Sequence, residues 1–454
     1  MINTVDRSTP PESGEKISFE IPQIKVLELN NGIEIYFVQK DKLPIVQTFA
    51  MTFSGSRLDP SDKKGLAFLT SLLIDEGAAE YDALQLNNEI EKLGSVLMIS
   101  SDHDNFSFSL LSLKENFERS VELFSKIILR PRFEEKDFNR EKKKTLDRLI
   151  QLSDEPSFIA SSAFEKQIFQ NVNYAFPEIG YPETVATISN EDVIGFYKNF
   201  IEEADIKIVV VGALDENELI DLFEKYLSGW RQKRGSVEAL PALQRSATKF
   251  FFCHKQDSAQ AEIRIGHLSK NRNAGDFYSA RIMNTILGGQ FSSRINLNLR
   301  ERRGFTYGAG SSFDYYKDAA LFEVSTAVNI KNTAEAITEI FNELKGIKEN
   351  ISEEEINFAK SYLIKQFPSR FETYTQIAKN ISPIIIHSLP VDYYNSYTAD
   401  LDKVTSGEVK LAAEENIFPD QSVVIAVGDK KEILPQLKTL SDDIIELDIY
   451  GNRI

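Results

Sequence analysis

The segment Leu287–Tyr307 carries two side chains, Arg300 and Tyr307, whose chemistry suits the binding of carbonyl groups. An arginine presents a planar fork of N–H donors, and a tyrosine presents one hydroxyl on a rigid ring. We expect the arginine near the end of a helix and the tyrosine just inside a strand, so that both can face one cleft. The alternative is that Arg300 is a solvated partner of Glu301 and that Tyr307 is half-buried packing.

The elements around these residues follow from local signals. The apolar run 281–287 predicts the end of a buried helix, and Gly288–Gly289 predicts a break, because glycine accepts positive φ and lets backbones approach closely. Ser292–Ser293 is expected to cap a second helix that carries Ile295, Leu297 and Leu299. Cations followed by Gly304 predict the end of that helix, and a strand is expected from Phe305 onward.

The rest of the sequence holds no recognisable catalytic motif. It has four histidines, and no two of them are spaced to lie on one helical face as in a zinc-binding H-x-x-E-H helix. The triplet Asp102-His103-Asp104 is expected to be a solvated turn rather than a ligand set. The one cysteine, Cys253, lacks the context of a nucleophile, and no nucleophile-elbow or P-loop spacing occurs.

Composition limits the protein class. The chain has 454 residues and a net charge of −17, which argues against nucleic acid and anionic membrane surfaces as partners. A single cysteine fits a reducing compartment. Residues 1–16 are polar and are expected to form a disordered tail, and no apolar stretch approaches the ~20 residues that cross a bilayer. These features predict a cytoplasmic location.

The order of expected elements occurs twice along the chain. Each half has strands, an apolar helix, a long helix that starts near Glu134 or Ser352, and a buried strand near its end, Ile206–Gly212 or Val423–Gly428. We therefore predict an α+β fold with two homologous domains, residues 17–230 and 249–454, joined by a polar linker, residues 231–248.

The stretch Gly65–Ala78, GLAFLTSLLIDEGA, resembles the motif helix of the pitrilysin/insulinase-type zinc peptidases, which include mitochondrial processing peptidase. The resemblance runs from about residue 25 to residue 448. It implies two domains, each a mainly antiparallel sheet packed with helices, that together form half of a clamshell. At the family's positions for the two zinc-binding histidines, the general base and the distant third ligand, this chain has Phe68, Leu72, Ser71 and Arg148.

With these positions vacated, the resemblance implies no catalytic residue and no metal in this chain. Phe68 and Leu72 are expected to fill the vacated space by apolar packing. The segments 287–294 and 300–307 resemble the family's C-terminal signature, and its substrate-binding Arg and Tyr fall on Arg300 and Tyr307.

In this family some peptidases divide the work between two chains, and this sequence resembles the chain without zinc. The resemblance then implies a heteromeric zinc metalloendopeptidase, inactive as this chain alone, with zinc in a homologous partner and unfolded peptides as substrates. Strand addition to a sheet edge is the expected mode of peptide binding. The alternative is a purely structural or peptide-binding subunit that contributes nothing to catalysis.

Overall fold

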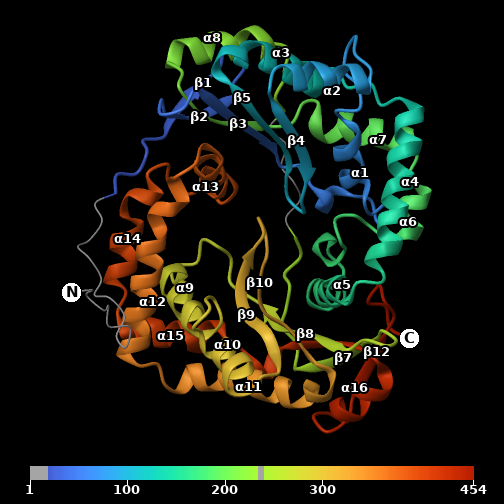
Figure 1. Cartoon of the computed structure of the whole chain (residues 1–454), viewed down its shortest axis with the longest axis vertical. Coiled ribbons are helices and arrows are strands. Elements are labelled where there is room, and N and C mark those ends of the chain that lie inside the picture. The colour runs from blue at the N-terminus through green and yellow to red at the C-terminus, as the bar shows by residue number, and fades with distance from the viewer. Residues whose placement is uncertain (1–18, 234–239) are drawn as a thin grey trace, which may run out of the picture.

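Two six-stranded sheets form the frame of the protein. The computed structural model describes residues 19–233 and 240–454 (Figure 1). The first sheet contains β1 (Lys25–Glu28), β2 (Glu34–Gln39), β3 (Ile45–Thr52), β4 (Val96–Ser101), β5 (Phe106–Leu113) and β6 (Ile206–Gly212). The second contains β7 (Lys249–His254), β8 (Gln260–Leu268), β9 (Thr306–Tyr315), β10 (Ala320–Asn329), β11 (Val423–Gly428) and β12 (Ile444–Leu447).

The two sheets share one strand order. It is β1-β2-β6-β3-β5-β4 in the first sheet and β12-β7-β11-β8-β10-β9 in the second. In the first sheet β6 pairs in parallel with β2 and antiparallel with β3, and in the second sheet β11 pairs in the same way with β7 and β8. Only the sixth strands differ, because β1 is antiparallel to β2 whereas β12 is parallel to β7. The predicted α+β class is confirmed, and both sheets are mixed.

Helices cover the sheets and also occur in matching order. The first half has α1 (Leu66–Leu73), α2 (Ala83–Lys92), α3 (Phe117–Leu129), α4 (Glu135–Leu152), α5 (Pro156–Phe169), α6 (Pro182–Thr187), α7 (Asn190–Phe196) and α8 (Glu216–Leu227). The second has α9 (Phe277–Leu287), α10 (Arg294–Asn296), α11 (Thr333–Glu349), α12 (Glu353–Gln366), α13 (Tyr374–Ile386), α14 (Tyr393–Lys403), α15 (Ser406–Asn416) and α16 (Lys430–Leu437). In the described residues, no helix is both long and apolar enough to cross a bilayer.

Several local predictions are confirmed. The predicted buried strands are β6 and β11, and the long helices expected near Glu134 and Ser352 are α4 and α12, the latter opened by a capping box between Ser352 and Glu355. The predicted tail, residues 1–16, lies outside the described residues, as do 234–239 of the predicted linker. The described remainder of residues 231–248 is neither helix nor strand.

Each half of the chain contributes one helix that packs on the sheet of the other half. Helix α5 packs on β8 and β11 of the second sheet, where Phe164 joins a buried cluster with Ile425 and Val427. Its counterpart α13 packs on β3 and β6 of the first sheet, in one cluster with Val209 and Val211. Figure 1 shows α5 beside the second sheet and α13 beside the first. The second face of each sheet is therefore buried by a helix from the other half of the chain.

The β4–β5 turn meets the β9–β10 turn at a polar junction. The Asp104 carboxylate accepts a hydrogen bond of 2.7 Å from the Lys317 backbone N–H and one of 2.5 Å from the Tyr174 hydroxyl. The buried Arg57 guanidinium forms an ion pair with Asp318 of the second half. Buried polar groups are costly without partners, so this network fixes the two turns against each other.

We predict that Gly266→Ala destabilises the protein by about 3 kcal/mol, the upper end for overpacking a core. A Cβ on Gly266 would lie 1.9 Å from the Phe322 carbonyl oxygen and 2.8 Å from the Phe164 ring, so the sheet and α5 must separate. Gly346→Ala is the control, since a Cβ there meets nothing within 4 Å and α11 should gain up to about 1 kcal/mol. Chemical denaturation measures both, and equal stability of the two variants would contradict the close packing of β10 and α5 around Gly266.

A second prediction concerns pH. Burial, and then the nearby carboxylates of Glu323 and Glu178, raise the pKa of Glu165 on α5 to about 8. The folded state therefore keeps a proton that the unfolded chain releases near its ordinary pKa of about 4.3. This carboxyl should make stability fall as pH rises from about 4.3 to about 8, and the decline is clearest above about pH 7.5, where histidines of ordinary pKa, about 6.5, are already neutral.

Glu165→Gln should flatten this decline in thermal midpoint, whereas the exposed Glu372→Gln should leave it unchanged. The same slope in wild type and Glu165→Gln would show that this carboxyl does not retain its proton on folding.

Candidate functional site

The glycine pair after α9 allows close contact with β9. The Gly288 carbonyl accepts a hydrogen bond of 3.1 Å from Ser311 N–H, and a Cβ on Gly288 would lie 2.3 Å from the Ser311 hydroxyl. Asn284 of α9 also donates to the Ser311 carbonyl at 3.0 Å. The prediction of close approach is therefore confirmed. The predicted break is also confirmed, since α9 ends at Leu287, although neither Gly288 nor Gly289 adopts a positive φ.

The helix that follows is short and irregular. It begins as α10 and continues as a π-helical segment, Leu297–Arg302. Gly304 ends it with a φ of +65°, as predicted, and Phe305 N–H donates to the Leu299 carbonyl at 2.9 Å. The capping prediction is wrong, since Ser293 holds the N-cap position but its buried hydroxyl has no hydrogen-bond partner there.

Arg300 and Tyr307 flank this turn with their polar groups accessible. The Arg300 guanidinium lies 4.4 Å from the centre of the Phe291 ring, and its Nε is 3.6 Å from Glu301, too long for a strong hydrogen bond. The Tyr307 side chain on β9 is 93% exposed. Strand β9 and the π-helical segment pack together, so the two residues come from adjoining elements. That they face one cleft stays a prediction.

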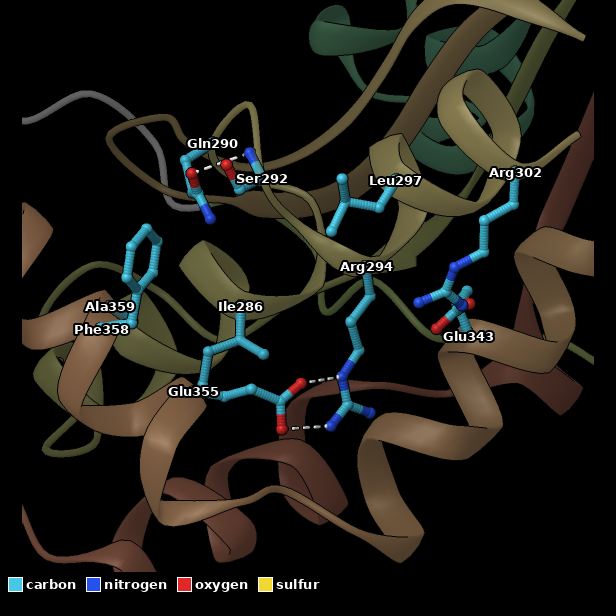
Figure 2. Close-up of a pocket in the computed structure, with 10 residues that line it drawn as sticks. All are labelled: Ile286, Gln290, Ser292, Arg294, Leu297, Arg302, Glu343, Glu355, Phe358 and Ala359. Carbon is cyan, nitrogen blue, oxygen red and sulfur yellow. Dashed lines mark hydrogen bonds and ion pairs between the residues drawn. The ribbon is translucent and has the colours of Figure 1, made fainter. Parts of the chain in front are cut away.

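A pocket of about 320 Å³ lies behind this segment, between α9, α11 and α12 (Figure 2). On its wall Arg294 donates from Nε and Nη2 to Glu355 at 2.6 and 2.8 Å, and Nη2 also reaches the Asn350 carbonyl at 2.7 Å. Burial alone would raise the pKa of Glu355, but the hydrogen bonds from Arg294 and Ser352 lower it to about 2. This fork, the bidentate ion pair between Arg294 and Glu355, holds the start of α10 on α12 and thereby positions the residues up to Arg300.

The vacated zinc positions lie on α1, which is held by a distant carboxylate. Asp59 accepts hydrogen bonds from the backbone N–H groups of residues 65, 66 and 67 at 2.9 to 3.2 Å. Ser71, at the position of the general base, is buried and donates to the Phe68 carbonyl at 2.7 Å. Phe68 and Leu72 are half-buried, and that they fill the vacated space by apolar packing stays a prediction. The buried face of α1 is carried by its other apolar residues.

At the fourth position, Arg148 on α4 is exposed. Its Nη1 lies 3.4 Å from Gln151 and from Glu155, a weak surface contact. About two turns earlier on α4, Glu141 is buried and accepts hydrogen bonds from Arg140 at 3.0 Å and Lys144 at 2.7 Å. Across residues 19–233 and 240–454, no group of three His, Cys, Asp or Glu side chains is arranged to hold a metal ion.

His103 and Cys253, which the sequence analysis singled out, are both buried in the protein. His103 is buried against the Tyr174 and Tyr316 rings, and burial lowers its pKa to about 4, so the expectation of a solvated turn is wrong. Cys253 is buried in β7, and burial raises the pKa of its thiol to about 12. A thiol in this state is a poor nucleophile.

Comparison with known proteins places these elements in a family. Residues 48–179 match the insulinase family, peptidase family M16, and residues 187–363 match the peptidase M16 inactive domain. Together the two ranges span more than half of the chain. The chain belongs to the M16 family.

Its M16 relatives include proteins described as inactive. A Helicobacter pylori protein described as non-peptidase homolog YmxG is 21% identical over 89% of this chain and 94% of its own. The Bacillus subtilis protein YmfF, described as a probable inactive metalloprotease, is 22% identical over 66% of this chain and 71% of its own. An uncharacterized zinc protease of Rickettsia felis is 22% identical over 74% and 81%.

Solved structures of other proteins have the same fold. The crystal structure of a peptidase M16 inactive domain from Pseudomonas fluorescens superposes with a TM-score of 0.83, at 21% identity, over 89% of this chain and 98% of that one. A protease from Helicobacter pylori superposes with a TM-score of 0.81, at 16% identity, over 90% and 100%.

We predict that Arg294→Ala loosens the segment that carries Arg300 without unfolding the protein. Loss of the fork leaves the half-buried Glu355 carboxylate without its cation, at a cost of about 1–3 kcal/mol. Amide hydrogen exchange should accelerate in peptides covering residues 294–305 and stay unchanged in those covering α8. Arg294→Lys should restore only part of the protection, because an ammonium group is not bidentate. Unchanged exchange in Arg294→Ala would refute the positioning role.

Proposed function

We propose that this chain is the non-zinc-binding subunit of a heteromeric zinc metalloendopeptidase and that it binds and positions peptide substrates. One contrast carries the proposal. The four metal and general-base positions hold Phe68, Ser71, Leu72 and Arg148, while Arg300 and Tyr307 keep accessible polar groups. A chain that had lost both chemistry and substrate binding would have no need for the second set.

The proposed chemistry divides between two chains. Zinc, expected in the partner subunit, would supply an activated water for attack on the peptide bond. Arg300 and Tyr307 would donate hydrogen bonds to carbonyl oxygens of the bound peptide, and one of them would stabilise the charge that develops on the scissile carbonyl. The Phe291 ring, with its centre 4.4 Å from the guanidinium carbon, restricts this group, and we assign its N–H donors to the ligand.

The partner is proposed to be a homologous chain with an intact H-x-x-E-H helix, and the substrates to be unfolded peptides. The relatives described as a non-peptidase homolog and a probable inactive metalloprotease support an inactive subunit. The acidic net charge supports the absence of nucleic acid as a partner. A cytoplasmic location is part of the proposal and rests on the single cysteine.

The second candidate is a structural subunit that contributes nothing to catalysis. Its support is the surface position of Arg300, whose nearest carboxylate belongs to its neighbour Glu301. On this reading the exposed tyrosine and arginine are ordinary surface residues. Kinetics of the assembled enzyme distinguish the two candidates.

We predict that Arg300→Ala lowers kcat/KM of the complex with the zinc-bearing partner by about 10- to 150-fold, the loss of one charge-assisted hydrogen bond. Tyr307→Phe should cost somewhat less, unless its hydroxyl contacts the developing oxyanion. The chain alone should cleave no peptide. Steady-state rates with a fluorogenic peptide, at matched assembly and thermal stability, provide the measurement.

Arg148→Ala is the matched control, since it removes an exposed arginine from the vacated site and should leave rates unchanged. Wild-type rates in both Arg300→Ala and Tyr307→Phe would favour the structural subunit. Chelator-sensitive cleavage by the purified lone chain would reject the division of labour.

A further inference from the structure

Tyr307 lies in a β-bulge, a point where strand β9 has one residue more than its partner strand β10. Two residues of β9, Tyr307 and Gly308, lie opposite the single residue Ala327 of β10. The ordinary cross-strand pairs on either side of the bulge are Thr306 with Val328 and Ala309 with Thr326. Bulges of this kind change the direction of a side chain and are frequent beside active sites.

The bulge decides which face of the second sheet Tyr307 occupies. Side chains two residues apart in a regular strand lie on the same face. A regular β9 would therefore put Tyr307 on the face of Ala309, which packs on the core of the second half. The extra residue places Thr306 on that face instead, opposite the buried Val328. Tyr307 thereby lies on the opposite face, where its side chain is exposed.

Two threonine hydroxyls bind the backbone of the bulge. Gly308 N–H donates to the Thr306 hydroxyl at 3.0 Å, and this hydroxyl donates to the Ala327 carbonyl at 2.7 Å. The Thr326 hydroxyl donates to the Gly308 carbonyl at 3.0 Å and lies 3.1 Å from the Thr306 hydroxyl. Regular pairing would put the two threonines on opposite faces of the sheet. These hydrogen bonds therefore stabilise the bulged register over the regular one.

The end of the bulge is tied to the segment that carries Arg300. Ala309 N–H donates to the Asn296 side-chain oxygen at 3.0 Å, and the Asn296 amide nitrogen donates to the Phe291 carbonyl at 2.6 Å. The Phe291 ring in turn lies against the Arg300 guanidinium. With this end of β9 fixed, the bulge sets where the Tyr307 ring lies relative to Arg300.

We propose that Thr306 is a positioning residue, whose hydroxyl holds the bulge that directs Tyr307 away from the core and towards a bound peptide. Thr326 assists by binding the Gly308 carbonyl. The inference rests on the proposed function for the presence of the peptide, since Thr306 acts on substrate only through Tyr307. The hold of Thr306 on the bulge needs no peptide and can be measured on the chain alone.

The first measurement is amide hydrogen exchange of the full chain by mass spectrometry. Thr306→Val keeps the β-branched shape but removes the acceptor of Gly308 N–H. Exchange in peptides covering residues 306–310 should accelerate about 2- to 10-fold, as for the loss of one neutral hydrogen bond, and stay unchanged in α8. Thr306→Ser, which keeps the hydroxyl, should retain wild-type exchange. Unchanged exchange in Thr306→Val would overturn the inference.

Thr48→Val is the matched control. Thr48 is a buried strand threonine of β3, and its hydroxyl has no hydrogen-bond partner among the described residues. Its replacement should change neither the exchange of residues 306–310 nor the rates of the complex.

The second measurement is kinetic and uses the complex with the zinc-bearing partner and a fluorogenic peptide, at matched thermal stability. Thr306→Val should lower kcat/KM about 2- to 10-fold, and Thr306→Ser should restore it. In the Tyr307→Phe background, Thr306→Val should cause no further loss, because the hydroxyl that it positions is already absent. An equal loss in both backgrounds would reject a positioning role.

Failure of the proposed function has a different signature. Arg300→Ala and Tyr307→Phe would then both keep wild-type rates, which would also remove any role of the bulge in substrate binding. Failure of this inference alone would appear as reduced rates in those two variants together with wild-type rates in Thr306→Val.

Discussion

Burial of the second face of each sheet is the constraint on which the rest of the structure depends. The first faces are covered by helices of their own half, but β6 and β11 are buried on both sides and need a second cover. Helices α5 and α13 provide it reciprocally, and on β8 a Cβ at Gly266 would meet both the backbone of the neighbouring strand β10 and the Phe164 ring of α5. Because apolar burial is the main favourable term in folding, neither half completes its core without the other. The sites on α1 and on β9 therefore depend on the same packed core.

The elements of the fold could be predicted from the sequence, but the packing of α5 and α13 on the sheet of the other half could not. The two buried strands and the starts of the long helices α4 and α12 follow from signals within a few residues, and the structure has them where expected. The destination of α5 follows from no local signal, since its partners on β8 and β11 lie about 100 to 260 residues away in sequence. A repeat in element order predicts two similar sheets and says nothing about which half covers which face.

The candidate site shows the same division. Arg300 could be placed at a helix end and Tyr307 at a strand start, because Gly304 between them marks the end of the helix. The fork from Arg294 to Glu355, 61 residues on, could not be predicted, because an ion pair between distant elements has no spacing rule. The failed cap at Ser293 has a physical reason. A short helix that passes at once into a π-helical segment is set by its contacts with α9 and β9, which outweigh the preference of one N-cap residue.

Because α13 covers the first sheet, that sheet is completed during translation before the helix that buries its second face has been made. Strand β6 completes the first sheet at Gly212, whereas the helix that covers its second face ends at Ile386. At roughly 5–20 residues per second, a ribosome needs on the order of 10 to 35 seconds to make the intervening chain. During that interval the first sheet is present with Val209 and Val211 uncovered. The nascent chain is then most prone to aggregation, and a chaperone that shields an apolar sheet face would act within it.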